Sequence, residues 1–242
     1  MADRRFSGIA RLYGEAGAQA IASARLCVVG VGGVGSWVVE ALARSGVGGL
    51  TLIDMDHVTE SNINRQLPAL ESTLGRAKIG VLAERVVQIN PACEITLVDD
   101  FISSDNLALL LEQAYDWVLD CIDNARVKAA MIAWCRMRGR RIVTVGAAGG
   151  QIDTTRVRVS DLRRTEQDAL LARTRRILRQ QAGFPRSFDV PAVWSDEPVR
   201  TVDNCTNDGS LNCAGFGACM PVTAAFGMAA AAHVLRDLAE GV

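Results

Sequence analysis

The sequence LCVVGVGGVGSW, at residues 26–37, contains the feature that decides the fold. A short apolar run leads into four glycines, and a helix-like stretch follows from 34 to 45. The glycines are Gly30, Gly32, Gly33 and Gly35. Because glycine has no Cβ, this backbone can turn tightly and approach a phosphate, and the free N–H groups at the start of a helix attract anions. The stretch therefore predicts a strand, a turn and a helix that together bind a nucleotide.

The same alternation of apolar runs and amphipathic stretches continues to about residue 146. The predicted strands are 26–30, 50–54, 94–98, 117–121 and 142–145, and the predicted helices are 34–45, 75–90, 104–113 and 125–138. Strands that are apolar on both faces and alternate with helices form a parallel sheet that is covered on both sides. The sequence thus predicts an α/β protein with a doubly wound, mostly parallel, Rossmann-like sheet.

The second half of the chain is less regular. It contains a short alternating strand at 156–159, an arginine-rich stretch to about 186, an irregular loop with prolines, and a closing helix from about 221 to 239. We expect a single domain over residues 1–242. Its parts are an N-terminal helical arm (1–25), a nucleotide-binding core (26–146), a basic substrate-side insertion (147–212), and a glycine-rich turn with the closing helix (213–242).

Composition narrows the possible classes. The seven cysteines are scattered and form no Cys-x-x-Cys pair, so we expect no zinc site and a reducing, cytoplasmic setting. Residues 209–235 carry no formal charge, but their first half is polar and contains a proline. We therefore expect a buried closing helix there and no contact with a membrane. Only Lys78 and Lys128 are lysines among the 26 basic side chains, and the rest are arginines.

Polar residues gather just beyond the carboxyl ends of the predicted strands, where open α/β sheets bind ligands. They are Asp54, Asp56, Asn62, Arg65, Gln66, Lys78, Asp120 and Asp123. Cations beside carboxylates fit an enzyme that cleaves a nucleoside triphosphate. Charge grows on the phosphoryl oxygens in the transition state of that reaction, and fixed cations and magnesium stabilise it.

Other interpretations remain open for these residues. Asn62 could cap a turn, Arg65 could be an ordinary surface residue, and Asp123 with Asn124 could cap the helix that starts at 125. The glycines and Asp54 would also suit a nicotinamide-dependent oxidoreductase or a non-catalytic nucleotide-binding module. A dehydrogenase has no use for an arginine and a lysine that converge on phosphates, so Arg65 and Lys78 disfavour that class. In an arginine-rich chain, the compact ammonium of Lys78 also favours a point-charge role.

Five motifs together resemble the ubiquitin-activating-enzyme-like (ThiF/MoeB/HesA-type) adenylating superfamily. They are GxGGxG at 30–35, DxD at 54–56, SNxNRQ at 61–66, GxxK at 75–78 and DxxDN at 120–124. Residues 4–14, 32–37, 147–153 and 215–218 further resemble the tRNA threonylcarbamoyladenosine dehydratase branch. The resemblance extends over nearly the whole chain.

The resemblance implies an ATP-dependent ligase. The threonyl carboxylate of N6-threonylcarbamoyladenosine in tRNA would attack the α-phosphate of ATP, and the resulting acyl adenylate would close a ring within the same base. It also implies that Gly30, Gly32, Gly33 and Gly35 frame the nucleotide, with Asp54 on its ribose and Asp56 among the nucleotide-binding residues. Asn62, Arg65, Gln66 and Lys78 would contact phosphates, and Asp123 would hold magnesium or orient the α-phosphate. Arg65, Lys78 and Asp123 are the expected catalytic residues.

Several partners are left open. Relatives in this superfamily are homodimers that lend an N-terminal arginine to the partner's site, and Arg5 and Arg11 are both candidates. A monovalent cation, Na⁺ or K⁺, near residues 147–150 and a sulfur-transfer protein are further possibilities. The alternative activity is adenylation of the C-terminus of a ubiquitin-like sulfur carrier, which the absence of zinc cysteine pairs disfavours. Cys205, Cys213 and Cys219 lie close together, but no histidine near them in the sequence could activate a thiolate.

The net charge of −1 hides a strong segregation. Residues 136–186 contain 13 arginines and four acidic residues, a net charge of +9, which leaves −10 for the remainder. Arg173 and Arg176 share one face of a predicted helix, and Arg175 and Arg179 share a neighbouring face. Arginine binds phosphates with two hydrogen bonds and stacks on unpaired bases, so the segment predicts contact with the anticodon region of tRNA.

Overall fold

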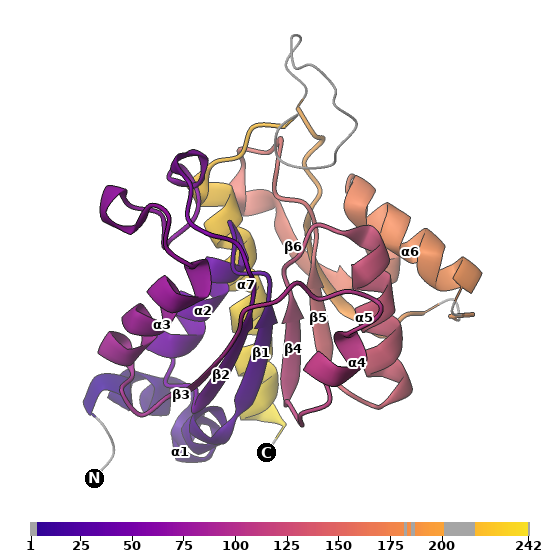
Figure 1. Ribbon diagram of the computed structural model, residues 1–242. Coiled ribbons are helices and arrows are strands. Elements are labelled where there is room, and N and C mark those ends of the chain that lie inside the picture. The colour runs from indigo at the N-terminus through magenta and orange to yellow at the C-terminus, as the bar shows by residue number, and fades with distance from the viewer. Residues whose placement is uncertain (1–3, 182, 185–186, 201–215, 242) are drawn as a thin grey trace.

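The computed structural model describes residues 4–181, 183–184, 187–200 and 216–241. A seven-stranded sheet with the order β3-β2-β1-β4-β5-β7-β6 forms its centre (Figure 1). The strands are β1 Arg25–Val29, β2 Gly49–Ile53, β3 Glu94–Val98, β4 Trp117–Asp120, β5 Ile142–Val145, β6 Val157–Asp161 and β7 Pro191–Ser195. All neighbouring strands are parallel except β6 and β7, which are antiparallel.

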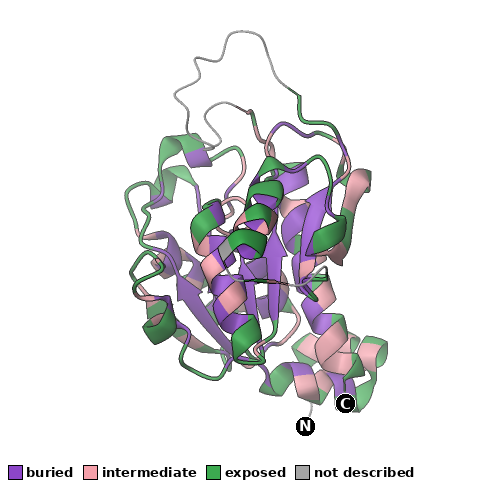
Figure 2. Cartoon of the chain, turned by 90° about the vertical axis from the view of Figure 1, so that its right-hand side faces the viewer, coloured by how far each residue is buried: buried purple, intermediate pink, exposed green. Residues whose placement is uncertain are grey.

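Helices cover both faces of this sheet. They are α1 Ser7–Ser23, α2 Gly35–Arg44, α3 Lys78–Ile89, α4 Leu107–Leu110, α5 Ala125–Met137, α6 Ala169–Gln181 and α7 Met220–Glu240. Successive side chains of a strand point to opposite faces, so β1 contributes Leu26 and Val28 to one apolar cluster and Cys27 and Val29 to the other. The first cluster includes α1, α2, α3 and α7, and the second includes α4, α5 and α6. Figure 2 shows the strands buried between helices whose outer faces are exposed.

The predicted fold is confirmed. Six of the seven strands and most of the helices lie within a few residues of the ranges predicted from the sequence. Two details were wrong. The helix predicted for 104–113 is only the single turn α4, and the irregular loop predicted beyond 186 contains β7, which inserts between β5 and β6. As a result, part of the basic insertion belongs to the same sheet as the nucleotide-binding core.

The closing helix α7 packs closely against α2. A Cβ at Gly227 would lie 2.7 Å from the carbonyl oxygen of Val34 and 2.9 Å from the Cβ of Trp37, so only glycine allows this approach. Val222, Phe226 and other apolar residues of α7 are buried. Within the described residues, no helix is long and apolar enough to cross a membrane. The uncharged run at 209–235 is therefore this packed helix from Met220 onward, and its residues 209–215 lie outside the described part.

The order of the strands reverses between β1 and β4. β1 continues to β2 on one side, whereas the chain returns to pair β4 with the other side of β1. In open α/β sheets, such a switch point leaves a crevice outside the carboxyl ends of the strands, and ligands bind there. The loops that carry the predicted site residues leave this edge of the sheet, at the top of Figure 1.

Candidate active site

Two of the four glycines after β1 are required by the fold. Gly30 has a φ of +81°, and a Cβ there would lie 2.9 Å from the Cγ2 of Ile122. A Cβ at Gly35 would lie only 1.8 Å from the carbonyl oxygen of Gly30. These two glycines therefore bring the turn close to the loop after β4 and allow α2 to start directly above it.

The other two glycines are not required by packing. A Cβ at Gly32 would lie 3.7 Å from the nearest side-chain atom, in Gln66, and a Cβ at Gly33 would lie 3.5 Å from Arg65 and Thr223. Both distances are ordinary van der Waals contacts. Glycine at these positions leaves bare backbone beneath Arg65 and Gln66, which fits close approach by a phosphate.

Asp54 ties this turn to the end of β2. One carboxylate oxygen accepts a hydrogen bond from the N–H of Val31 over 2.7 Å, and the other accepts one from the N–H of Asp56 over 2.8 Å. Burial raises the pKa of the Asp54 carboxyl, and the two backbone hydrogen bonds partly offset that rise. Asp54 thus holds the glycine turn in place, and its predicted contact with a ribose stays a prediction.

Lys78, the first residue of α3, points its ammonium at Asp56. The Nζ lies 2.8 Å from the Oδ2 of Asp56, and the lysine side chain is only 6% exposed whereas that of Asp56 is 52% exposed. An ammonium has three N–H donors, so this pair leaves donors for another anion. Asp56 therefore orients a nearly buried cation at the carboxyl edge of the sheet.

Arg65 lies in the loop that precedes α3. Its Nη1 donates to the carbonyl oxygen of Ser61 over 2.7 Å and to the Oδ1 of Asn64 over 2.9 Å. Both acceptors are neutral, so within the described part of the chain the guanidinium is not paired with a carboxylate. Its positive charge stays available beside Gly33.

Two residues near Arg65, Asn62 and Gln66, differ in whether their side-chain oxygens have hydrogen-bond partners. The Oδ1 of Asn62 accepts from the N–H of Thr59 over 3.2 Å, so Asn62 does cap a turn, as one interpretation of the sequence held. Gln66 is 7% exposed, and its Oε1 has no hydrogen-bond partner among the described residues. A buried polar atom without a partner is costly, and Gln66 lies beside Gly32, where a nucleotide would supply a partner through its hydroxyls.

The loop after β4 brings Asp123 to the same edge. Asp123 is exposed, while the side chain of Asn124 caps α5 by accepting from the N–H groups of Arg126 and Val127 over 3.0 and 3.3 Å. The capping interpretation therefore holds for Asn124 and leaves the carboxylate of Asp123 free to face a ligand. The glycine turn thus follows β1, Arg65 and Lys78 follow β2, and Asp123 follows β4. These three strands are adjacent in the sheet.

Comparisons with known proteins show the family of this chain. Residues 6–240 match the model of the ThiF family. The chain belongs to the ThiF family. The tRNA threonylcarbamoyladenosine dehydratase of Haemophilus influenzae is 46% identical over 244 residues, which cover 98% of this chain and 94% of that protein. The family predicted from the sequence is confirmed.

Solved structures of similar proteins have the same fold. The structure of the Escherichia coli tRNA N6-threonylcarbamoyladenosine dehydratase in complex with AMP has a TM-score of 0.91 and 47% sequence identity, and the match covers 98% of this chain and 95% of that chain. The structure of the same enzyme in complex with ATP has a TM-score of 0.90, 46% identity and the same coverage. This chain is therefore similar, over nearly its whole length, to ThiF-family proteins that were solved with adenine nucleotides.

One group in this ThiF-family fold was not predicted from the sequence. The Nζ of Lys128, in α5, lies 3.0 Å from the Oδ1 of Asp120 and 3.3 Å from the hydroxyl of Thr144. That hydroxyl donates to the other oxygen of Asp120 over 2.7 Å. All three side chains are fully buried. Because Asp120 precedes and Lys128 follows the loop at 121–124, this ion pair closes the loop that carries Asp123.

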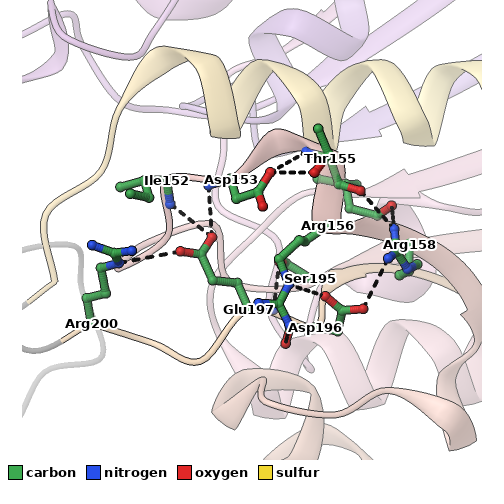
Figure 3. A network of polar contacts seen from close by, with 10 residues as sticks. Ile152, Asp153, Thr155, Arg156, Arg158, Ser195, Asp196, Glu197 and Arg200 are labelled. Carbon is green, nitrogen blue, oxygen red and sulfur yellow. Dashed lines mark hydrogen bonds and ion pairs between the residues drawn. The ribbon is translucent and has the colours of Figure 1, made fainter.

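A second unpredicted network fixes the segment after β5. Asp168 accepts from the N–H of Ala147 over 2.9 Å and from the N–H of Leu171 over 2.8 Å, which joins this segment to α6. Glu197 accepts from the N–H groups of Ile152 and Asp153 over 3.0 and 2.9 Å (Figure 3). These backbone hydrogen bonds hold the pKa of Glu197 below its usual value. The segment 147–153, which contains the glycine-rich turn, is thus held by Asp168 at its start and by Glu197 at its end.

The cysteine nearest the glycine turn is not activated. Burial raises the pKa of Cys121, which lies beneath the glycine turn, to about 12, so this thiol is neutral at pH 7. Cys219 immediately precedes α7, whereas Cys205 and Cys213 lie outside the described residues. Within the described ranges, no group of three or more His, Cys, Asp or Glu side chains could hold a metal ion.

Proposed function

We propose that the chain dehydrates N6-threonylcarbamoyladenosine in tRNA by ATP-dependent adenylation, with release of AMP and pyrophosphate. The observation that carries the proposal is the guanidinium of Arg65, which pairs with no carboxylate among the described residues and lies beside the bare backbone of Gly33, with Lys78 at the same sheet edge. Family membership, similarity to dehydratases of this name and the ATP and AMP complexes of the Escherichia coli enzyme support it.

The residues fit the two steps of this reaction. In the first, an oxygen of the threonyl carboxylate attacks the α-phosphorus of ATP and the bond to the pyrophosphate breaks. Arg65 and Lys78 stabilise the charge that grows on the phosphate oxygens. In the second, a nucleophilic atom of the same threonylcarbamoyl group attacks the activated carbonyl, the ring closes, and AMP leaves. The reaction removes one water from the base overall and needs no enzyme thiolate, which agrees with the neutral Cys121.

The described residues also fit the predicted cations. The exposed carboxylate of Asp123 at the carboxyl edge would hold Mg²⁺, which binds proteins through one or two carboxylates together with substrate phosphates. The ion would neutralise charge on those phosphates. Gln151 is 2% exposed, and its Oε1 has no hydrogen-bond partner among the described residues. An amide oxygen is a cation ligand, so Gln151 is where we would place the predicted Na⁺ or K⁺ near 147–150.

A direct test of the proposed function uses the modified nucleoside itself. The protein is incubated with ATP, Mg²⁺ and tRNA that bears N6-threonylcarbamoyladenosine, and the nucleosides are analysed by mass spectrometry after mild digestion. We expect a product lighter by one water, with one pyrophosphate and one AMP released for each product. Pyrophosphate release that requires a ubiquitin-like sulfur carrier, with no change in the nucleoside, would instead support the alternative adenylyltransferase.

The structure separates the arginines of the basic segment by their contacts. Arg156 and Arg158 pair with Asp196, as Figure 3 shows, and Arg136 and Arg141 pair with Asp189 and Asp237. The guanidiniums of Arg138 and Arg179 lie over the rings of Trp134 and Phe188, and Arg186 lies outside the described residues. More than half of the arginines in the segment therefore make contacts within the chain or lie outside the described residues.

Four exposed arginines remain around α6. They are Arg163, Arg164, Arg173 and Arg176, and none of them pairs with a carboxylate among the described residues. Arg175, which the sequence places with Arg179 on a neighbouring helix face, is partly buried and instead donates to the Thr165 hydroxyl and the Leu162 carbonyl. It thereby joins α6 to the turn that carries Arg163 and Arg164. These four arginines form the surface that we propose for the tRNA backbone.

Reversing two of these charges is expected to weaken tRNA binding. Arg173→Glu/Arg176→Glu should lower the affinity by at least about 10-fold at low salt. It should also reduce the slope of log K against log salt by about 2, because each phosphate contact that is lost means about one counterion fewer released on binding. Filter binding over a salt series measures both. Arg140→Glu/Arg236→Glu makes the same change of charge in a groove at the opposite edge of the sheet. Equal loss in both variants would contradict a specific surface on α6.

We also propose that the chain forms a homodimer. Leu12 in α1, Val159 in β6 and Met228 in α7 are large apolar side chains that are 71%, 41% and 41% exposed. Arg5 precedes α1 and Arg11 lies within it, so both are placed on the arm that would reach a partner's site. Sedimentation velocity tests the dimer, and the same experiment with a sulfur-transfer protein added tests that predicted partner.

A further inference from the structure

The backbone carbonyl of Arg65 accepts hydrogen bonds from two helices. The indole Nε1 of Trp37, in α2, donates to it over 3.0 Å, and the hydroxyl of Thr223, in α7, donates over 3.4 Å. The Thr223 hydroxyl has one hydrogen and also lies 3.2 Å from the carbonyl of Met220, so its donation is divided. The indole has one N–H and a single acceptor. The hydrogen bond from Trp37 is therefore the undivided one of the two that reach the Arg65 carbonyl.

The guanidinium end of Arg65 is fixed by Asn64. The Oδ1 of Asn64 accepts from Arg65, while its Nδ2 donates to the carbonyl of Ala218 over 2.8 Å. The N–H of Met220 donates to the carbonyl of Asn64 over 3.1 Å. The loop that carries Arg65 is thus bonded to the start of α7 as well as to α2.

The crossing of α2 and α7 makes this arrangement possible. Glycine at 227 lets the two helices approach at Trp37, so that both reach the same carbonyl. The methylenes of Arg65 lie next to Gly33, at the distance of van der Waals contact for a Cβ built there. A shift of the Arg65 backbone would therefore move the guanidinium relative to the glycine turn.

We propose that Trp37 is a positioning residue for Arg65, through the hydrogen bond from its indole to the Arg65 carbonyl. This proposal rests on the proposed function, because it assigns Trp37 a role in adenylation only through Arg65. Trp37 does not itself contact the nucleotide in this proposal. A displaced catalytic cation loses transition-state stabilisation even where the substrate still binds, so the effect should fall on kcat more than on KM.

Trp37→Phe keeps a six-membered aromatic ring but removes the N–H together with part of the indole. We expect the single-turnover rate of pyrophosphate release to fall about 10-fold, the loss that corresponds to one hydrogen bond, with little change in the KM for ATP. Trp117→Phe is the matched control, because its indole makes a similar bond over 3.1 Å to Asp237 at the opposite edge of the sheet. The two variants should have similar melting temperatures, and the control should keep the wild-type rate. Equal rates in both variants would overturn the proposal.

A double-mutant cycle with Arg65→Ala separates positioning from general damage. If Trp37 acts through Arg65, Trp37→Phe should cause no further loss in the Arg65→Ala background, because the interaction has already been removed. A further 10-fold loss in that background would show that Trp37 acts elsewhere and would overturn the proposal. If Arg65→Ala itself has the wild-type rate, the assignment of Arg65 fails instead, so the two failures can be told apart.

Discussion

Arg65→Ala is expected to lower the single-turnover rate of pyrophosphate release by about 10²–10³-fold, the usual cost of removing one preorganised group that stabilises developing charge. The guanidinium lies beside Gly33 and is not paired with a carboxylate among the described residues, so its charge is available to phosphate oxygens there. A rapid-quench assay with ATP, Mg²⁺ and tRNA that bears N6-threonylcarbamoyladenosine measures the rate. The melting temperature should change little, because among the described residues the Arg65 side chain hydrogen-bonds only to Ser61 and Asn64 in its own loop.

Arg76→Ala is the matched control for this prediction. Arg76 precedes α3 in the same crossover but pairs with Glu84 on the helix surface, and such exposed pairs contribute little to stability. We expect the control to keep the wild-type rate. Lys78→Ala should resemble Arg65→Ala, since it removes the cation that Asp56 orients. A near-normal rate in Arg65→Ala or Lys78→Ala would contradict the role assigned to that residue.

Lys128→Met is expected to have the largest effect on stability. It removes the ammonium from the fully buried pair with Asp120 and leaves a buried carboxylate without its counter-ion. Breaking such a pair on one side costs about 3–5 kcal/mol, so the free energy of unfolding should fall by that amount. Urea denaturation followed by circular dichroism measures the loss. A wild-type midpoint would mean that the pair does not contribute as the structure indicates.

A variant that removes the whole network provides the control. In Asp120→Val/Lys128→Met/Thr144→Val, no charge and no hydroxyl remain unpaired, and apolar replacement of a complete buried ion pair is often close to neutral. We expect this variant to recover most of the stability lost in Lys128→Met. If it is instead as unstable as Lys128→Met, packing at this position would account for the loss rather than the unpaired charge.

The nucleotide-binding half could be predicted well because its signals are local. Apolar runs such as 26–30 predict the strands on their own, and the glycines at 30–35 mark a tight turn that residues with a Cβ could not adopt. The carboxyl ends of parallel strands meet at one edge, so Asp54, Arg65 and Asp123 could be placed together from order alone. That their loops leave adjacent strand ends is confirmed, whereas their individual contacts with ATP stay predictions.

The remainder depends on contacts that are distant in sequence. β7 begins with a proline, which is unusual for a strand inside a sheet, so its place between β5 and β6 is set by the sheet and not by its own residues. Lys128 looks like any residue of an amphipathic helix until Asp120 and Thr144 come together around it. The arginines of the basic segment could be counted from the sequence, but which of them are paired with carboxylates could not be predicted. Partners such as Asp196 lie some 40 residues from Arg156 in the chain.

The two lysines have a practical consequence for chemical labelling. Lys78 is 4% exposed and Lys128 is 0% exposed. Esters that acylate amines therefore find no accessible lysine on the folded chain. Acylation at either position reports that the protein has opened: at Lys78 through movement around the start of α3, and at Lys128 through separation of α5 from the sheet. Because the chain has only these two lysines, their acylation can be used to follow local opening at Lys78 and larger-scale unfolding at Lys128.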